Sequence, residues 1–146
     1  MIRANAGVLI AASLIAGSAS AATLDEPGKR CNNAMLNGNY GAQMQGTRPA
    51  PGGTESVIGV VVRNYDGRGG LTQIGNVKGS ITGIVPDQFG EGTYEVREDC
   101  SVIVEFSPVP GVVIHEQGVI VDNAREIRVI TVAPQALMVT AVMIRI

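Results

Sequence analysis

The sequence has 146 residues, a net charge of −2, 3% aromatic residues and no Trp. This charge argues against a nucleic-acid partner, because there is no basic stripe to neutralise phosphates. The scarcity of aromatic rings argues against a platform for carbohydrate or single-stranded nucleic acid, since such platforms stack rings on aromatic side chains.

The first 21 residues have the three parts of a secretory signal peptide in the usual order. Met1-Ile2-Arg3 supplies positive charge, 7–17 is an apolar run, and Ala19-Ser20-Ala21 fits the small-x-small cleavage rule. The run is too short for a membrane span, which needs about 20 residues, and Ser18 stands where a lipid anchor would need cysteine. An N-terminal core helix is the alternative. We predict cleavage before Ala22, no membrane anchor, and an exported product that is periplasmic or secreted.

The chain after this segment is long enough for one domain with a real core. Removing 21 of 146 residues leaves 125, with ten basic and 13 acidic side chains and therefore a charge of −3. We divide it into an extended lead-in over 22–39, which contains about one helical turn, and a single β-domain over 40–146.

Two cysteines remain, Cys31 and Cys100. In an exported protein an even pair is interpreted first as a disulfide. Closing a loop of that length would stabilise the fold by about 4 kcal/mol in the chain-entropy model. Two buried free thiols are the alternative. Two cysteines and the lone His115 cannot complete a four-ligand zinc site, so we expect neither a metal nor a cofactor.

Alternating and β-branched apolar segments predict about eight strands joined by short turns. The predicted strands begin at about Tyr40 and comprise 40–45, 56–64, 71–77, 92–97, 101–106, 112–121, 125–131 and 137–146. We expect 47–54, which holds two prolines, to be a loop, and 80–91 to be a strand end followed by a loop. This pattern indicates a sandwich or a barrel. A meander of eight strands can close into an antiparallel up-and-down barrel, which has no exposed edges.

Asp66-Gly67-Arg68-Gly69-Gly70 predicts a hairpin turn, in which Asp-Gly supplies a positive φ angle. A calcium loop is the alternative interpretation of this acidic, Gly-rich stretch. It has one carboxylate and so lacks the oxygen ligands that calcium requires.

Four segments resemble those of a recurrent group of small exported bacterial proteins. They are Cys31-x-Asn33-x-x-Leu36-x-Gly38-x-Tyr40-Gly41, Asp66-Gly67-x-Gly69, Gly92-Thr93-Tyr94-x-Val96-x-x-Asp99-Cys100 and Val121-Asp122-Asn123-x-x-Glu126-Ile127-Arg128. The pattern of that group is similar to the allene oxide cyclase and lipocalin-like barrels. The likeness covers nearly all of the chain after the signal segment, but it consists of turn and strand signatures. It implies a barrel that holds a small apolar ligand, and it transfers no catalytic residue. One departure is Asn123-Ala124, where such sequences tend to have Asn-Gly.

The register of the hairpin around Asn123 decides which of its residues face inward. A two-residue turn at 123–124 predicts three cross-strand pairs: Val121 with Glu126, Ile120 with Ile127, and Glu116 with Thr131. In this register Ile114, Glu116 and Ile120 face the interior. A carboxylate among apolar side chains could bind or protonate a ligand. The alternatives are that Glu116 lies in water at a barrel rim, or that a shift of one residue turns it outward.

Three hypotheses follow for the function. The first is an exported, non-catalytic barrel that binds a small apolar molecule in a cavity lined by Glu116, Tyr94, Ile114 and Ile120.

The second is a structural or interaction module. Runs such as 60–62 and 138–146 cannot point all their apolar side chains inward, because successive side chains alternate. Large exposed apolar patches usually mark interfaces, so this hypothesis predicts a homo-oligomer. The third is a cyclase or isomerase with Glu116 as its acid or base. We favour them in this order.

Overall fold

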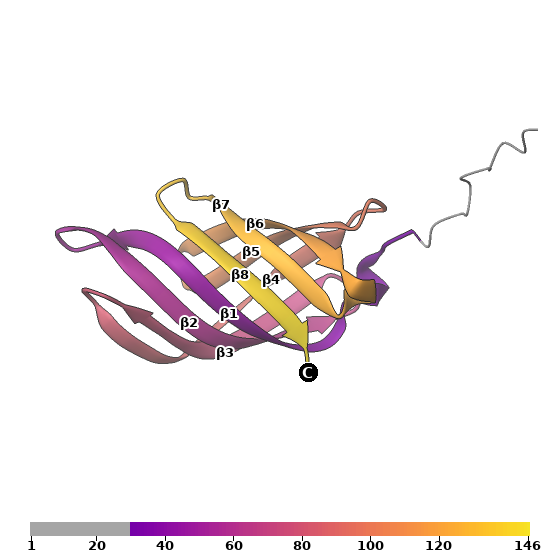
Figure 1. Cartoon of the computed structure of the whole chain (residues 1–146), viewed down its shortest axis with the longest axis horizontal. Coiled ribbons are helices and arrows are strands. Elements are labelled where there is room, and N and C mark those ends of the chain that lie inside the picture. Colours follow the sequence, from indigo (N-terminus) through magenta and orange to yellow (C-terminus); the bar gives the residue numbers. More distant parts are fainter. Residues whose placement is uncertain (1–29) are drawn as a thin grey trace, which may run out of the picture.

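The computed structural model describes residues 30–146, so the predicted signal peptide and its cleavage site lie outside the described residues. The described chain forms a closed barrel whose strands follow one another around the wall in sequence order (Figure 1). The predicted eight-stranded antiparallel up-and-down barrel is confirmed. Residues 30–146 contain no helix with the length and apolar character to cross a membrane. The elements are η1 (Asn33–Met35), β1 (Asn37–Ala50), β2 (Gly53–Asp66), β3 (Gly70–Gly79), β4 (Gly83–Val96), β5 (Ser101–Val109), β6 (Val112–Val121), η2 (Asp122–Ala124), β7 (Glu126–Ala133) and β8 (Met138–Arg145).

Burial alternates along the strands, as expected where one face of each strand points into the barrel and the other points out. In β2 the buried side chains are Glu55, Val57, Val61, Arg63 and Tyr65. The exposed side chains between them include Ile58, Val60 and Val62. Apolar residues therefore occupy both faces of this strand, as the unbroken apolar run predicted.

The hairpin of β1 and β2 is longer than the sequence predicted. Its cross-strand pairs run from Asn37 with Asp66 to Ala50 with Gly53, so the predicted loop over 47–54 is wrong and the turn is confined to 51–52. The proline at position 49 is compatible with this strand because β1 pairs with β8 only as far as Thr47. Beyond that point β1 is an edge strand, where proline is tolerated.

The predicted loop in 80–91 is also wrong, because β4 is continuous from Gly83 to Val96. Its pairing with β3 shifts register between Gly75 and Val77. Pro86 and Asp87 fall at this irregularity, and Asp87 has a φ of 50°. The residues that resemble a loop thus form a β-bulge, which admits proline into a strand.

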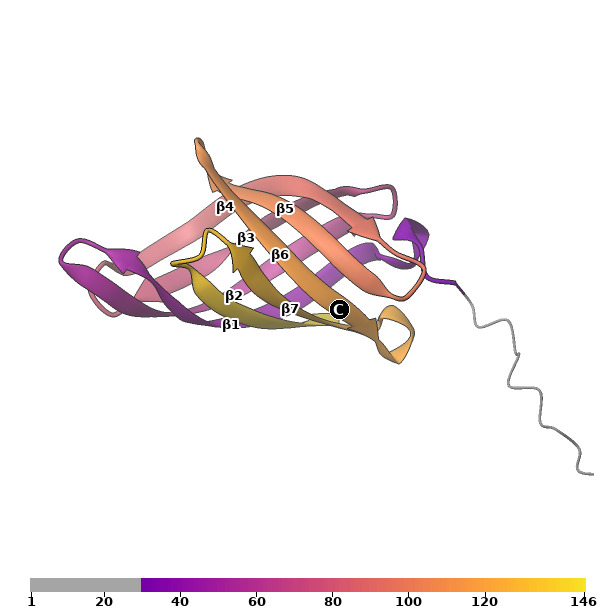
Figure 2. The same cartoon turned by 90° about the horizontal axis from the view of Figure 1, so that it is seen from above.

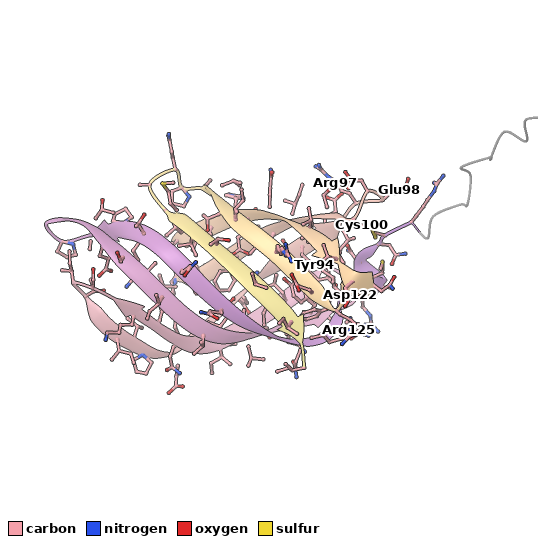
Figure 3. All side chains as sticks on the ribbon, in the orientation of Figure 1. Tyr94, Arg97, Glu98, Cys100, Asp122 and Arg125 are labelled. Atoms are coloured by element: carbon pink, nitrogen blue, oxygen red, sulfur yellow. A yellow bond between two sulfur atoms is a disulfide. The ribbon has the colours of Figure 1, made fainter. Side chains whose placement is uncertain are left out.

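One end of the barrel is closed by the segment before β1. The predicted disulfide joins Cys31 to Cys100 in the β4–β5 turn, with Cα atoms 5.0 Å apart. Figure 3 shows Cys100 beside Arg97 and Glu98 at this end. β1 begins at Asn37, three residues before the expected start of the sheet, and η1 supplies a helical turn in the lead-in.

The three tyrosines of the chain fill the barrel at this closed end. The ring of Tyr65 meets those of Tyr40 and Tyr94 edge to face, with centroids 5.4 and 4.9 Å apart. The Tyr40 hydroxyl donates to the carbonyl of Ala124 (2.6 Å), and the Tyr94 hydroxyl donates to that of Leu36 (2.9 Å). Because the hydroxyls have partners and the rings are buried, this layer forms a solid floor.

Candidate functional site

Above the tyrosine layer the barrel contains a cavity of about 470 Å³. Its lining includes Arg48, Pro108 and Pro134, so it reaches the opposite end of the barrel. At that end the β1–β2 and β3–β4 hairpins project beyond the rest of the wall (Figures 1 and 2). Its wall is mostly apolar and includes Ala42, Met44, Val57, Val61, Val77, Phe106, Ile114, Val129, Val139, Ala141 and Met143. Pockets of this size with apolar walls and a few polar groups are typical of small-molecule sites.

An ion pair crosses the barrel inside this cavity. The Nη1 atom of Arg63 donates to Oε2 of Glu116 (2.6 Å), and Nη2 donates to Oε1 (3.2 Å). The Arg63 side chain is 3% exposed and that of Glu116 is 12% exposed. β2 and β6 are four strands apart in the ring of eight, so the pair connects opposite walls. Its bidentate geometry is the strong form of such pairing.

Two further contacts fix the Arg63 guanidinium in this position. Its Nε donates to the Oε1 atom of Gln73 (2.9 Å), and its Cζ atom lies over the Phe106 ring, 5.2 Å from the centroid. Burial opposes the charge of the guanidinium, but the Glu116 carboxylate outweighs this effect and raises the pKa of Arg63 above its ordinary value. Arg63 therefore stays charged inside the barrel.

A second polar cluster lies at the mouth of the cavity. The buried carboxylate of Glu55 accepts hydrogen bonds from Arg48 Nε (2.7 Å), from the backbone N–H groups of Ile81 and Thr82 (2.8 and 2.9 Å), and from the Thr82 hydroxyl (2.8 Å). A Cβ atom at Gly79 would overlap this carboxylate. Because Arg48 and Glu55 belong to the β1–β2 hairpin and Thr82 to the β3–β4 turn, the cluster ties the two projecting hairpins together.

These hydrogen bonds hold Glu55 in its ionised form. The backbone N–H of Thr82 contributes most and the Arg48 guanidinium next, and together they lower the pKa of Glu55 to about 2. The rim of the cavity thus carries a second ion pair, between Arg48 and Glu55.

The predicted register of the β6–β7 hairpin is confirmed, because Val121 pairs with Glu126, Ile120 with Ile127 and Glu116 with Thr131. The connection itself differs from the assumed two-residue turn. It is the 3₁₀ turn η2, in which Asp122, Asn123 and Ala124 all have positive φ angles between 51° and 63°. Figure 3 shows Asp122 and Arg125 at the closed end of the barrel.

Of the four residues predicted to bind a ligand, Glu116 and Ile114 line the cavity. Tyr94 and Ile120 also face inward and are buried, but they belong to the packed core at the closed end. Strand periodicity indicates which face a residue occupies. It does not indicate the height along the barrel axis at which the interior stops being solid.

Arg63 is the principal residue that the sequence interpretation missed. A signal was present, since period two places Arg63 on the same face as Val61 and Tyr65. A carboxylate inside a barrel requires a cationic or hydrogen-bonding partner. An inward Glu116 therefore implies an inward-facing basic residue on another strand.

The outer wall carries a band of apolar side chains across neighbouring strands. Cross-strand pairing aligns Phe89, Ile74, Val62, Gly41 and Ile144 in one row, which we call the outer apolar row. The exposed fractions of Phe89, Ile74, Val62 and Ile144 are 56%, 48%, 39% and 55%.

Within residues 30–146 no three His, Cys, Asp or Glu side chains gather closely enough to hold a metal ion. Comparison with known proteins gave no further assignment. A scan of protein-family models, a search of curated proteins and a search of solved structures each found no match.

Proposed function

We propose that this protein is an exported, non-catalytic barrel that binds one small, mainly apolar molecule in its cavity. The observation that carries the proposal is the 470 Å³ space, which has apolar walls and opens at one end of the barrel. An apolar wall favours an apolar ligand, because burial of apolar surface contributes about 25 cal/mol per Å².

Two further points support export and the ligand class. The disulfide between Cys31 and Cys100 is typical of an oxidising environment outside the cytoplasm. The signal-peptide pattern of residues 1–21 and the resemblance to small exported barrels of the allene oxide cyclase and lipocalin-like type agree with this proposal.

The arrangement of Glu116 favours binding over acid–base catalysis. Both of its carboxylate oxygens accept hydrogen bonds from Arg63. A general base must take up the substrate proton, and a protonated Glu116 would leave the buried Arg63 guanidinium without its counter-ion.

Native mass spectrometry of the non-reduced, exported protein tests the proposal, from gentle to dissociating conditions. We expect a small molecule of discrete mass that leaves on activation. A cavity-filling substitution, Val139→Phe, should abolish retention, whereas the same substitution at outward-facing Val142 should not. An empty protein that also fails to bind any apolar fluorophore would contradict the proposal.

A second candidate function is that of a homo-oligomeric interaction module. It is supported by the outer apolar row, because contiguous exposed apolar surface usually marks an interface. This function uses the outside of the barrel and is compatible with ligand binding inside it.

A further inference from the structure

We propose that the ligand is electrically neutral and places a hydroxyl or carbonyl group on the Arg63–Glu116 pair, and that the cavity selects against molecules with a charged head group. This inference rests on the proposed binding function and specifies the class of molecule that the cavity accepts. It follows from the charge balance of the cavity.

Among the described residues, the charged side chains at the cavity form two matched pairs. Arg63 and Glu116 lie inside it, and Arg48 lines its mouth while bound to Glu55. In residues 30–146, every buried side-chain nitrogen and oxygen already has a hydrogen-bond partner. The site is therefore neutral and satisfied before any ligand enters, and it lacks an uncompensated charge that would attract an ion.

An anionic head group would meet an occupied guanidinium. To reach Arg63 it would have to displace Glu116, which holds both terminal nitrogens, or lie beside that carboxylate. Displacement leaves a buried carboxylate unpaired, and like charges placed together in a buried site cost several kcal/mol. A cationic head group would have to displace the Arg63 guanidinium from Glu116 or lie beside that guanidinium, at a similar cost.

A neutral polar group avoids both penalties. A guanidinium has five N–H donors, and the hydrogen bonds to Glu116 and Gln73 use three of them. Carboxylate oxygens have further lone pairs. A hydroxyl can therefore accept from Arg63 and donate to Glu116 without breaking the pair, while its chain lies along the apolar wall towards the mouth.

Three probes with the same hydrocarbon chain and different head groups test this inference: 1-dodecanol, dodecanoate and dodecylammonium. Their affinities for the full exported protein are measured at neutral pH by displacement of a bound apolar fluorophore. We expect the alcohol to bind at least about tenfold more tightly than either ion, because like-charge contacts in a desolvated site cost more than the 1.4 kcal/mol that corresponds to tenfold.

Two substitutions give opposite expectations. Glu116→Gln leaves Arg63 without its counter-ion and should shift the preference towards dodecanoate by about tenfold or more, and Arg63→Gln should shift it towards dodecylammonium. Glu105→Gln is the matched control, because it removes the same charge from an exposed position on the neighbouring strand β5. It should leave all three affinities unchanged.

The outcomes separate this inference from the proposed function. If none of the three probes binds, the binding function itself is wrong. If all bind equally, or if an ion binds best to the unmodified protein, the cavity binds ligands but the charge-balance inference is overturned. An unchanged preference in both folded variants would also overturn it. Should a variant fail to fold, the ranking of the probes on the unmodified protein still decides.

Discussion

Glu55 is a buried carboxylate that stays ionised because four donors from two hairpins surround it. Its pKa in the folded protein is about 2, below its usual value of 4.5. A carboxyl group whose pKa is lowered by folding stabilises the folded state above its unfolded pKa, and this stabilisation is lost as the pH falls towards the folded pKa.

We therefore expect Glu55→Gln to lower the melting temperature by several degrees at neutral pH. The difference between the unmodified protein and the variant should shrink as the pH is lowered from 4.5 to about 2, because protonation removes the same charge from the unmodified protein. Thermal unfolding followed by circular dichroism across this range measures the effect. Glu95→Gln, at an exposed position of β4, serves as control. A difference that does not depend on pH would contradict this account of Glu55.

The Arg63–Glu116 pair should show strong coupling in a double-mutant cycle. Replacing either residue with Met leaves a buried charge unpaired, which costs about 3–5 kcal/mol. The double replacement should be less destabilising than the sum of the two, with a coupling energy of about 1–3 kcal/mol. Urea denaturation measures each free energy of unfolding. The pair Arg30–Glu98, whose side chains are 77% and 71% exposed, gives a reference cycle, whose coupling should stay below about 1 kcal/mol. Equal coupling in both cycles would show that burial does not strengthen the inner pair.

At this scale the sequence predicted half of the site. The predicted register of β6 with β7 is confirmed. The sequence left open whether Glu116 faces the interior, the barrel rim or the outside, and the structure places it on the cavity wall. Its partner lies on β2, and the two residues are 53 positions apart. No local sequence pattern predicts a contact across the lumen. Which strands face each other depends on the number of strands in the closed ring.

Among the elements, the lead-in is held to the barrel by one covalent bond. The disulfide connects residues 69 positions apart, and a loop of that length corresponds to about 4 kcal/mol of stabilisation in the chain-entropy model. The lead-in is also held by noncovalent contacts. The Asn33 side chain accepts from the backbone N–H of Val96 (2.7 Å), and Asn33 lies in η1.

We expect the double variant Cys31→Ala, Cys100→Ala to lose about 4 kcal/mol of stability while it keeps the barrel. Urea denaturation measures the loss, and the strand signal in circular dichroism reports the fold. Adding a reductant should destabilise the unmodified protein by a similar amount and should leave the variant unaffected. A loss well below about 2 kcal/mol would mean that the noncovalent contacts of η1 already hold the lead-in.

The strands were predictable in number and order but not in length. Prolines and glycines at 47–54 and 80–91 are typical of loops, yet both stretches extend hairpins. One lies on an unpaired edge and the other at a bulge, and both are places where a strand admits proline. Whether a given stretch has a neighbouring strand on both sides is a property of the assembled barrel.

For the molecule as a whole, the outer apolar row predicts self-association. We expect native mass spectrometry and light scattering to show a homo-oligomer at micromolar concentration. Ile74→Glu, in the row, should shift it towards monomer because it places a charge in a contact that excludes water. Thr72→Glu, which is also exposed on β3, should not. A protein that is monomeric over the whole concentration range would contradict this prediction.

The closure of the barrel has a consequence for how the chain folds. The first strand pairs with the last, and the partners Tyr40 and Arg145 are 105 residues apart. Until β8 has been synthesised and has paired, β1 and β7 each have one edge without a neighbouring strand. Unpaired edges promote association with other chains. This closing pairing is non-local, so it should form more slowly than the pairings between strands that are neighbours in sequence. The protein therefore depends on its final eight strand residues, Met138–Arg145, to become a single closed molecule.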